Sequence, residues 1–171
     1  MMLLGFTTST NVTDTSWDGI IPKENKDREK FLEDIGHSES RNDYSKVNKY
    51  GFLGRYQFSR ATLKLLGIKV TKKEYLENPQ LQEDAMFLLL IANKKNLRKE
   101  IKKYSDTKIK GITVSESGIL AAAHLVGSGK VKKWLKSNGK KTKKDALGTS
   151  IESYMKRFGG YNLNLPGTVK I

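Results

Sequence analysis

Four short groups of residues in this chain of 171 residues have side chains that could take part in chemistry. In chain order they are Glu39-Ser40, Leu53-Gly54-Arg55-Tyr56-Gln57, Ala122 to Val131 with a Gly-x-Gly turn, and Tyr154. A carboxyl group among aromatic side chains is partly desolvated, which disfavours its charged form. Such a group can protonate the leaving oxygen of a glycosidic bond. Glu39, with Tyr56, Phe58 and Tyr154 as candidate neighbours, is therefore a candidate general acid.

Each group also has an ordinary structural explanation when it is taken alone. Glu39 could be a surface acid at a helix end, because charged residues are mostly exposed. Gly54 and Gln57 could form a turn with a polar cap. Tyr154 lies on the same apolar stripe as Ile151 and Phe158, which is typical of a core tyrosine. The order of the four groups, rather than any one of them, therefore carries the functional hypothesis.

In this order and spacing the four groups resemble the soluble lytic transglycosylases and goose-type lysozymes of the lysozyme-like superfamily. In that family a catalytic glutamate followed by serine ends a helix, and a Gly-Leu-Met-Gln motif comes next. An Ala-Tyr-Asn motif then leads to a Gly-x-Gly turn and a basic helix, and a tyrosine lies on a later helix. The resemblance covers about residues 27–161.

The resemblance implies a role for each matching position. Glu39 corresponds to the catalytic acid, and Ser40 to a serine that contacts substrate. Gly54 and Gln57 correspond to the ends of the second motif, where the family lets a sugar approach the backbone and hydrogen-bonds it. Tyr154 corresponds to the late tyrosine, whose hydroxyl points toward the glutamate.

The chain departs from the family motifs at four positions. Arg55 and Tyr56 replace the usual Leu and Met, and His124 and Leu125 replace the usual Tyr and Asn. The missing Asn removes a hydrogen bond to substrate. An Ala-His form of the motif is similar to that of some bacteriophage wall-degrading enzymes, which indicates a phage-type variant. A histidine on an apolar helix is more typical of a packed residue than of a proton donor, so we expect His124, like Tyr56, to contact substrate or to support Glu39.

The implied reaction is cleavage of the β-1,4 bond between N-acetylmuramic acid and N-acetylglucosamine in peptidoglycan, with Glu39 as general acid and base. In a lytic transglycosylase the acetamido group and the 6-hydroxyl of the substrate complete the reaction, and a 1,6-anhydro ring closes without water. A hydrolytic lysozyme of the same fold is the alternative. Attack by water requires a second carboxylate nearby, for which Asp43 and Asp34 are the candidates.

The charge of the chain is strongly positive and unevenly distributed. The formal net charge is +14, and residues 61–171 hold 23 basic and nine acidic residues, whereas residues 1–60 hold nine of each. The excess is concentrated in Lys94 to Lys110 and Lys130 to Lys144. A basic non-catalytic binder of nucleic acid or cell surfaces is thus the alternative of another class. The sequence contains no motif of a protein that reads nucleic-acid sequence, so we expect no specific nucleic acid as a partner. We instead expect anionic wall polymers or the outer-membrane surface as additional partners.

Other features of the composition narrow the expected chemistry. The chain contains no cysteine, and its two histidines, His37 and His124, have no metal-ligand spacing. We therefore expect neither a metal nor a cofactor. The first ten residues lack the pattern of a signal peptide, and no apolar run is long enough to span a membrane. These features suggest a monomeric phage lysin or virion component, or a domain of a longer exported protein.

The elements that must position these residues are expected to be mainly helical, in one lysozyme-like catalytic domain over residues 27–161. An irregular lead-in over 1–26 precedes it and an extended tail over 162–171 follows it. Asp27 to about His37 is predicted as an amphipathic helix, with Glu39 at or just past its end. Residues 42–58 are predicted as a loop or short hairpin, a small irregular or β-like patch after Glu39.

Capping and stop signals predict the remaining helices. Ser59 begins one that stops at Gly67, and Asn78 with Pro79 begins a buried central helix that runs to Tyr104. A capping box of Thr113 and Glu116 predicts a helix ending at Gly127, and a short helix follows over residues 130–137. A second box, Thr149 with Glu152, predicts a last helix ending at Gly159.

Overall fold

The computed structural model describes residues 25–141 and 148–166. Within these ranges the chain is mainly helical, as the sequence predicts, with seven helices and one two-stranded antiparallel sheet. The elements are α1 (Lys26–Ser40), α2 (Arg60–Leu65), α3 (Lys72–Leu76), α4 (Pro79–Tyr104), β1 (Lys108–Ile109), β2 (Ile112–Thr113), α5 (Glu116–Val126), α6 (Ser128–Lys136) and α7 (Ile151–Arg157). No helix in the described part of the chain is long and apolar enough to cross a membrane.

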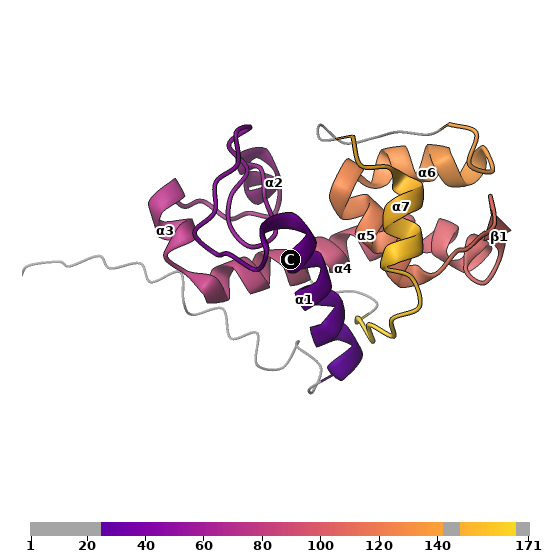
Figure 1. Ribbon diagram of the computed structural model, residues 1–171, viewed down its shortest axis with the longest axis horizontal. Coiled ribbons are helices and arrows are strands. Elements are labelled where there is room, and N and C mark those ends of the chain that lie inside the picture. The colour runs from indigo at the N-terminus through magenta and orange to yellow at the C-terminus, as the bar shows by residue number, and fades with distance from the viewer. Residues whose placement is uncertain (1–24, 142–147, 167–171) are drawn as a thin grey trace, which may run out of the picture.

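Helix α4 is the central helix of the fold, which confirms the predicted buried helix. Its N-terminus is capped by Asn78, whose side chain accepts a hydrogen bond from the amide of Leu81, and Pro79 occupies the first turn. Its middle, including Met86, Leu90 and Ile91, is buried. Figure 1 shows α2 and α3 at one end of α4 and α5, α6 and α7 at the other, with α1 between the two groups. Residues from both of these groups of helices thus meet at α1.

Helix α1 continues to Ser40 and therefore includes Glu39 in its last turn, a little beyond the predicted end. Arg41 adopts the left-handed conformation that ends many helices, and its amide bonds to the carbonyls of Gly36 and His37. In the loop that follows, isolated β-bridges pair Leu53 with both Val47 and Phe58. These bridges form the small β-like patch that the sequence predicts after Glu39.

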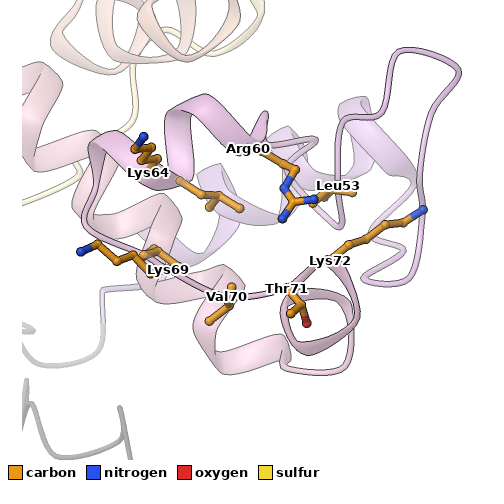
Figure 2. Close-up of a pocket in the computed structure, with 9 residues that line it drawn as sticks. Leu53, Arg60, Lys64, Lys69, Val70, Thr71 and Lys72 are labelled. Carbon is orange, nitrogen blue, oxygen red and sulfur yellow. The ribbon is translucent and has the colours of Figure 1, made fainter.

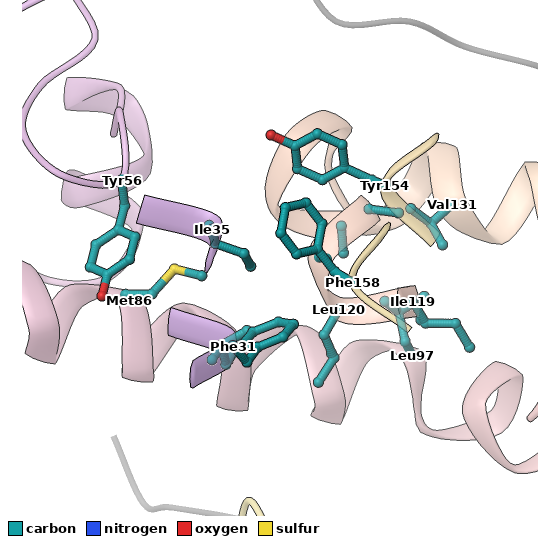
Figure 3. Packing of buried hydrophobic residues seen from close by; sticks show 14 of the residues in the cluster. Phe31, Ile35, Tyr56, Met86, Leu97, Ile119, Leu120, Val131, Tyr154 and Phe158 are labelled. Atoms are coloured by element: carbon teal, nitrogen blue, oxygen red, sulfur yellow. The ribbon is translucent and has the colours of Figure 1, made fainter. Parts of the chain in front are cut away.

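Aromatic and aliphatic side chains join α1 to α5 and α7 in one core (Figure 3). Phe31 packs edge-on against Phe158, with ring centroids 6.3 Å apart. Helices α5 and α7 approach closely because of Gly118, where a Cβ would lie 2.8 Å from the carbonyl oxygen of Met155. This contact fixes α7 beside α5.

For two helices, α5 and α7, the predicted N-terminal capping residue is wrong. Ser115, not Thr113, caps α5 through a hydrogen bond from the amide of Gly118, because Thr113 is paired with Lys108 in the sheet. Ser150, not Thr149, caps α7 through the amide of Ser153. In both cases a serine closer to the helix takes the position, which changes the helix start by one or two residues.

Several elements differ from the prediction in other ways. Helix α3, with a capping box of Thr71 and Glu74, and the β1-β2 hairpin were not predicted. The lead-in over 1–26 lies outside the described residues except for Asn25, which caps α1, and Lys26, the first residue of that helix. The described part of the tail, residues 162–166, has no regular structure, but Leu163 and Leu165 are buried in the core.

Candidate functional site

Glu39 is the point at which three helices converge. Its side chain, 15% exposed, lies in the last turn of α1. The hydroxyl of Tyr154 on α7 donates a hydrogen bond to Oε1 of Glu39 at 2.5 Å. The Nε2 atom of His124 on α5 lies 3.7 Å from the same oxygen. No described residue forms a hydrogen bond with Oε2, so one carboxyl oxygen is held by the protein and the other is free.

Packing fixes the position of Tyr154. The residue is 5% exposed, and its ring packs edge-on against Phe158 with centroids 4.9 Å apart. Figure 3 shows the two rings side by side, with the Tyr154 hydroxyl pointing away from the surrounding apolar side chains. One turn along α7, Arg157 donates a hydrogen bond to Oγ of Ser38 at 2.9 Å. Helix α7 is thereby attached to the last turn of α1 at both Ser38 and Glu39.

His124 is enclosed between Glu39 and the loop after α1. Its side chain is 7% exposed, and its ring lies 5.7 Å from the ring of Phe58. Burial lowers the pKa of His124, while the Glu39 carboxylate and the backbone of Tyr56 act in the opposite direction. The neutral form of the imidazole is therefore favoured more than in an exposed histidine. A neutral ring can donate or accept one hydrogen bond at Nε2 without adding charge beside Glu39.

The lowered pKa of His124 predicts a stability that falls on acidification. Below the ordinary value of 6.5 the unfolded chain binds a proton that the folded chain resists, so stability rises with pH in the window between the lowered value and 6.5. One such group contributes up to about 1.4 kcal/mol per pH unit. We expect the melting temperature of His124→Asn to depend less on pH between 5 and 7 than that of the unaltered protein. Equal slopes in a thermal denaturation series would contradict this.

Ser40 lies beside Glu39 in the chain but is buried, and its hydroxyl already has partners in the protein. It donates to the carbonyl of Arg55 at 2.8 Å and accepts from the amide of Asp43 at 2.9 Å. The structure thus gives Ser40 a role in holding the 41–58 loop against α1. Its contact with substrate remains a prediction.

Gly54 and Gln57 lie in the same turn of this loop. Gly54 has a φ of 70°, and a Cβ there would lie 2.0 Å from Oε1 of the buried Gln82 on α4. Gln57 also adopts a left-handed conformation and donates its side-chain amide to the carbonyl of Gly54 at 2.8 Å. Its Oε1 atom accepts no hydrogen bond from a described residue. Gly54 therefore serves close packing, while Gln57 has an acceptor available for a ligand.

Tyr56 is fully buried in the core, and its hydroxyl donates to Oε2 of Glu83 at 2.6 Å. The other oxygen of Glu83 accepts from Tyr44 and from Arg55, each at 2.8 Å. Burial, followed by the charge of Glu83, raises the pKa of Tyr56 far above its ordinary value. Sequence reasoning did not single out Glu83, although the departures at Arg55 and Tyr56 were a signal. A buried Arg and Tyr need a polar partner.

We expect Glu83→Gln to lower the free energy of unfolding by about 2 kcal/mol, because it removes a charge that pairs with Arg55, whose side chain is 14% exposed. Chemical denaturation measures the change. Asp84→Asn removes the same charge one residue away, where the carboxylate bonds only to Gln80 among described residues, and should cost under about 0.5 kcal/mol. Similar losses in both variants would contradict a special role for Glu83.

The two candidate second carboxylates are engaged elsewhere. Asp43 is exposed, and its Oδ1 accepts from the amide and the hydroxyl of Ser45, which lower its pKa. Asp34 accepts from the hydroxyl of Tyr161 at 2.6 Å and pairs with Lys30 at 3.0 Å. Five residues along a helix correspond to about 140° of rotation, so Asp34 faces a different side of α1 from Glu39. Neither carboxylate contacts Glu39 in the described structure. The described residues also contain no cluster of three or more His, Cys, Asp or Glu able to hold a metal ion.

The structure thus brings together Glu39, His124 and Tyr154 from positions far apart in the sequence, and places Ser40, Gly54, Tyr56 and Gln57 in or under the adjoining loop. Comparison with known protein families, curated proteins and solved structures finds no significant match to this chain.

Proposed function

We propose that this protein is a glycosidase with a lysozyme-like fold that cleaves the β-1,4 bond between N-acetylmuramic acid and N-acetylglucosamine in peptidoglycan. The observation that supports it best is the arrangement at Glu39. The carboxyl group is largely enclosed, Oε1 is held by Tyr154, and Oε2 is left without a partner among described residues. A fixed carboxyl with one free oxygen suits a residue that must deliver a proton to a defined atom.

In the proposed reaction Oε2 of protonated Glu39 gives its proton to the glycosidic oxygen as the bond from that oxygen to C1 of the muramic acid breaks. The carboxylate that results then takes the proton of the muramic acid 6-hydroxyl, whose oxygen attacks C1 and closes the 1,6-anhydro ring. Glu39 ends in its starting protonation state, and no water is consumed. Tyr154 keeps the carboxyl orientation through both steps, and neutral His124 borders it without a competing charge.

The environment of Asp43 and Asp34 favours the transglycosylase reaction over hydrolysis. An inverting hydrolase requires a second carboxylate about 6.5–9.5 Å from the acid, with room for water, and a retaining one a closer nucleophile. Asp43 is occupied by Ser45, and Asp34 by Tyr161 and Lys30. A hydrolytic lysozyme of the same fold is the second candidate.

Mass spectrometry of the products tests the proposal. Purified peptidoglycan incubated with the protein should release muropeptides that end in 1,6-anhydro-muramic acid. Reducing muramic acid ends would instead identify a hydrolase. If no glycan fragment is released from walls of several chemotypes, and the protein binds DNA tightly in a salt-sensitive way, the nucleic-acid alternative replaces the proposal.

We further propose that the lysine-rich half anchors the enzyme to anionic wall polymers or an outer-membrane surface, as in a bacteriophage lysin or virion component. Exposed lysines occur in the second half of α4 and on α6, including Lys95, Lys99 and Lys133. Such a surface is attracted to polyanions, and salt weakens the attraction. Activity on whole walls that is unaffected by Lys-to-Glu changes over residues 130–144 would count against this anchoring role.

A further inference from the structure

A cavity of about 270 Å³ lies between α2, α3 and the segment that joins them, apart from the contacts of Glu39. Figure 2 shows its lining. Its apolar wall consists of Leu53, Leu63, Ile68 and Val70. Four cationic side chains surround this wall, with Lys64 and Lys69 on one side and Arg60 and Lys72 on the other. An apolar surface between two pairs of cations can accommodate a ligand with small apolar groups and more than one negative charge.

The cations around this cavity are available to a ligand. All four residues are exposed, and none forms an ion pair with a described residue. No acidic residue lines the cavity. The nearby carboxylate of Glu74 is turned to the helix cap, where it accepts a hydrogen bond from the amide of Thr71. The charge of the cavity is therefore positive and uncompensated, and an anion is the complementary partner.

A short path of direct contacts connects the cavity with Glu39. Leu53 in the cavity wall is paired with Phe58, and each amide donates to the carbonyl of the other residue at 2.9 Å. The Phe58 ring lies 5.7 Å from the ring of His124, whose Nε2 lies 3.7 Å from Glu39. Only two residues, Phe58 and His124, therefore separate the cavity wall from Glu39 along this chain of contacts.

We infer that this cavity binds a stem peptide of the glycan strand that is being cleaved, an inference that rests on the proposed function. Stem peptides are attached to muramic acid, consist largely of small apolar residues and carry free carboxylates. They therefore match both the apolar wall and the paired cations. A glycan strand without stem peptides keeps one lactyl carboxylate per muramic acid, close to the sugar ring, and has no small apolar side chains that would match the wall of the cavity.

This inference can be tested with two soluble substrates of equal glycan length. One carries its stem peptides, and the other has been freed of them by an amidase. The variant Lys64→Glu/Lys69→Glu should lose about tenfold in kcat/KM on the peptide-bearing strands, since two favourable charge interactions become repulsive. Its activity on peptide-free strands should be unchanged. The control Lys46→Glu/Lys49→Glu makes the same charge change at exposed positions that lie outside both the cavity lining and the lysine-rich stretches, and should leave both activities near those of the unaltered protein.

A binding measurement separates the possible failures. When released stem tetrapeptide is titrated into the unaltered protein, it should shift the methyl resonances of Leu63, Ile68 and Val70. In the double variant the same titration should leave these resonances unshifted. Equal losses on both substrates, equal losses in the control variant, or no methyl shifts would overturn the inference. Absence of cleavage of either substrate by the unaltered protein would instead overturn the proposed function, while the titration still reports on the cavity.

Discussion

Replacement of Glu39 by glutamine should reduce the rate of peptidoglycan cleavage by about a thousandfold or more, since general acid-base catalysis contributes roughly 10²–10⁴-fold and one residue supplies both steps. Glutamine has nearly the same size and shape as the protonated carboxyl. Its carbonyl oxygen can still accept the hydrogen bond from Tyr154 that Oε1 accepts in the unaltered protein. Its amide nitrogen, in the place of Oε2, cannot release a proton. The variant should therefore keep the fold and the binding of glycan but lose the proton transfer.

Clearing of a peptidoglycan suspension gives the rate, and mass spectrometry of released muropeptides confirms that glycosidic bonds are cleaved. Glu33→Gln is the matched control, because Glu33 is an exposed acid on the same helix. It should clear the suspension at the rate of the unaltered protein. Binding of both variants to insoluble peptidoglycan should be similar. Clearing by Glu39→Gln at the unaltered rate would remove Glu39 from the mechanism and with it the proposed function.

The elements with strong local signals were predictable, and the cause is visible in α4 and α1. In α4, the cap, the proline and a run of apolar residues all indicate the same helix, and tertiary packing agrees with them. The contact between Tyr154 and Glu39 joins residues 115 positions apart. Periodicity cannot reveal such a contact. It was expected only because the order of motifs resembles a known arrangement.

The helix caps show the limit of a pattern that ignores its neighbours. Thr113 with Glu116 has the spacing of a capping box, but Thr113 is in β2 and Glu116 pairs with Lys94 at 2.9 Å. Ser115 caps instead and also accepts a hydrogen bond from the amide of Gly160. A two-residue strand is too short to give a recognisable alternation. The competing pairing was therefore hidden.

Tyr56 shows why side-chain direction in the loop could not be predicted. The loop follows Glu39 closely, so an aromatic side chain there was expected to enclose the carboxyl group. Its hydroxyl instead bonds to Glu83, 27 positions away on α4, and the ring is fully buried. A buried hydroxyl must find a partner, and the nearest strong acceptor decides where the ring points. That acceptor is known only when α4 has been placed against the loop.

Gly54 is the position in this loop where a single methyl group should cost most. We expect Gly54→Ala to lower the free energy of unfolding by about 3 kcal/mol or more, because two costs add. A left-handed backbone, with φ of 70°, costs an alanine roughly 1–2 kcal/mol. Overpacking in a filled interior costs roughly 1–3 kcal/mol, and the new Cβ would lie 2.0 Å from Oε1 of Gln82.

Gln82 cannot simply move aside. It is fully buried, accepts a hydrogen bond from the amide of Arg55, and donates to the carbonyls of Tyr44 and Tyr75. Displacing it breaks these bonds of α4 to the loop and to α3. The same displacement would shift the carbonyl of Gly54 that anchors Gln57, so activity should fall with stability.

Gly51→Ala separates the two costs. Gly51 also has a positive φ, of 81°, but a Cβ there would meet no atom within 4 Å. Only the backbone cost applies, and we expect a loss of about 1 kcal/mol with unchanged activity. Denaturant unfolding of the two variants gives the difference directly. If both alanine variants lose the same free energy of unfolding, Gln82 moves aside without an energetic penalty. In that case the close approach of α4 to the loop does not hold Gln57 and the neighbouring residues in place.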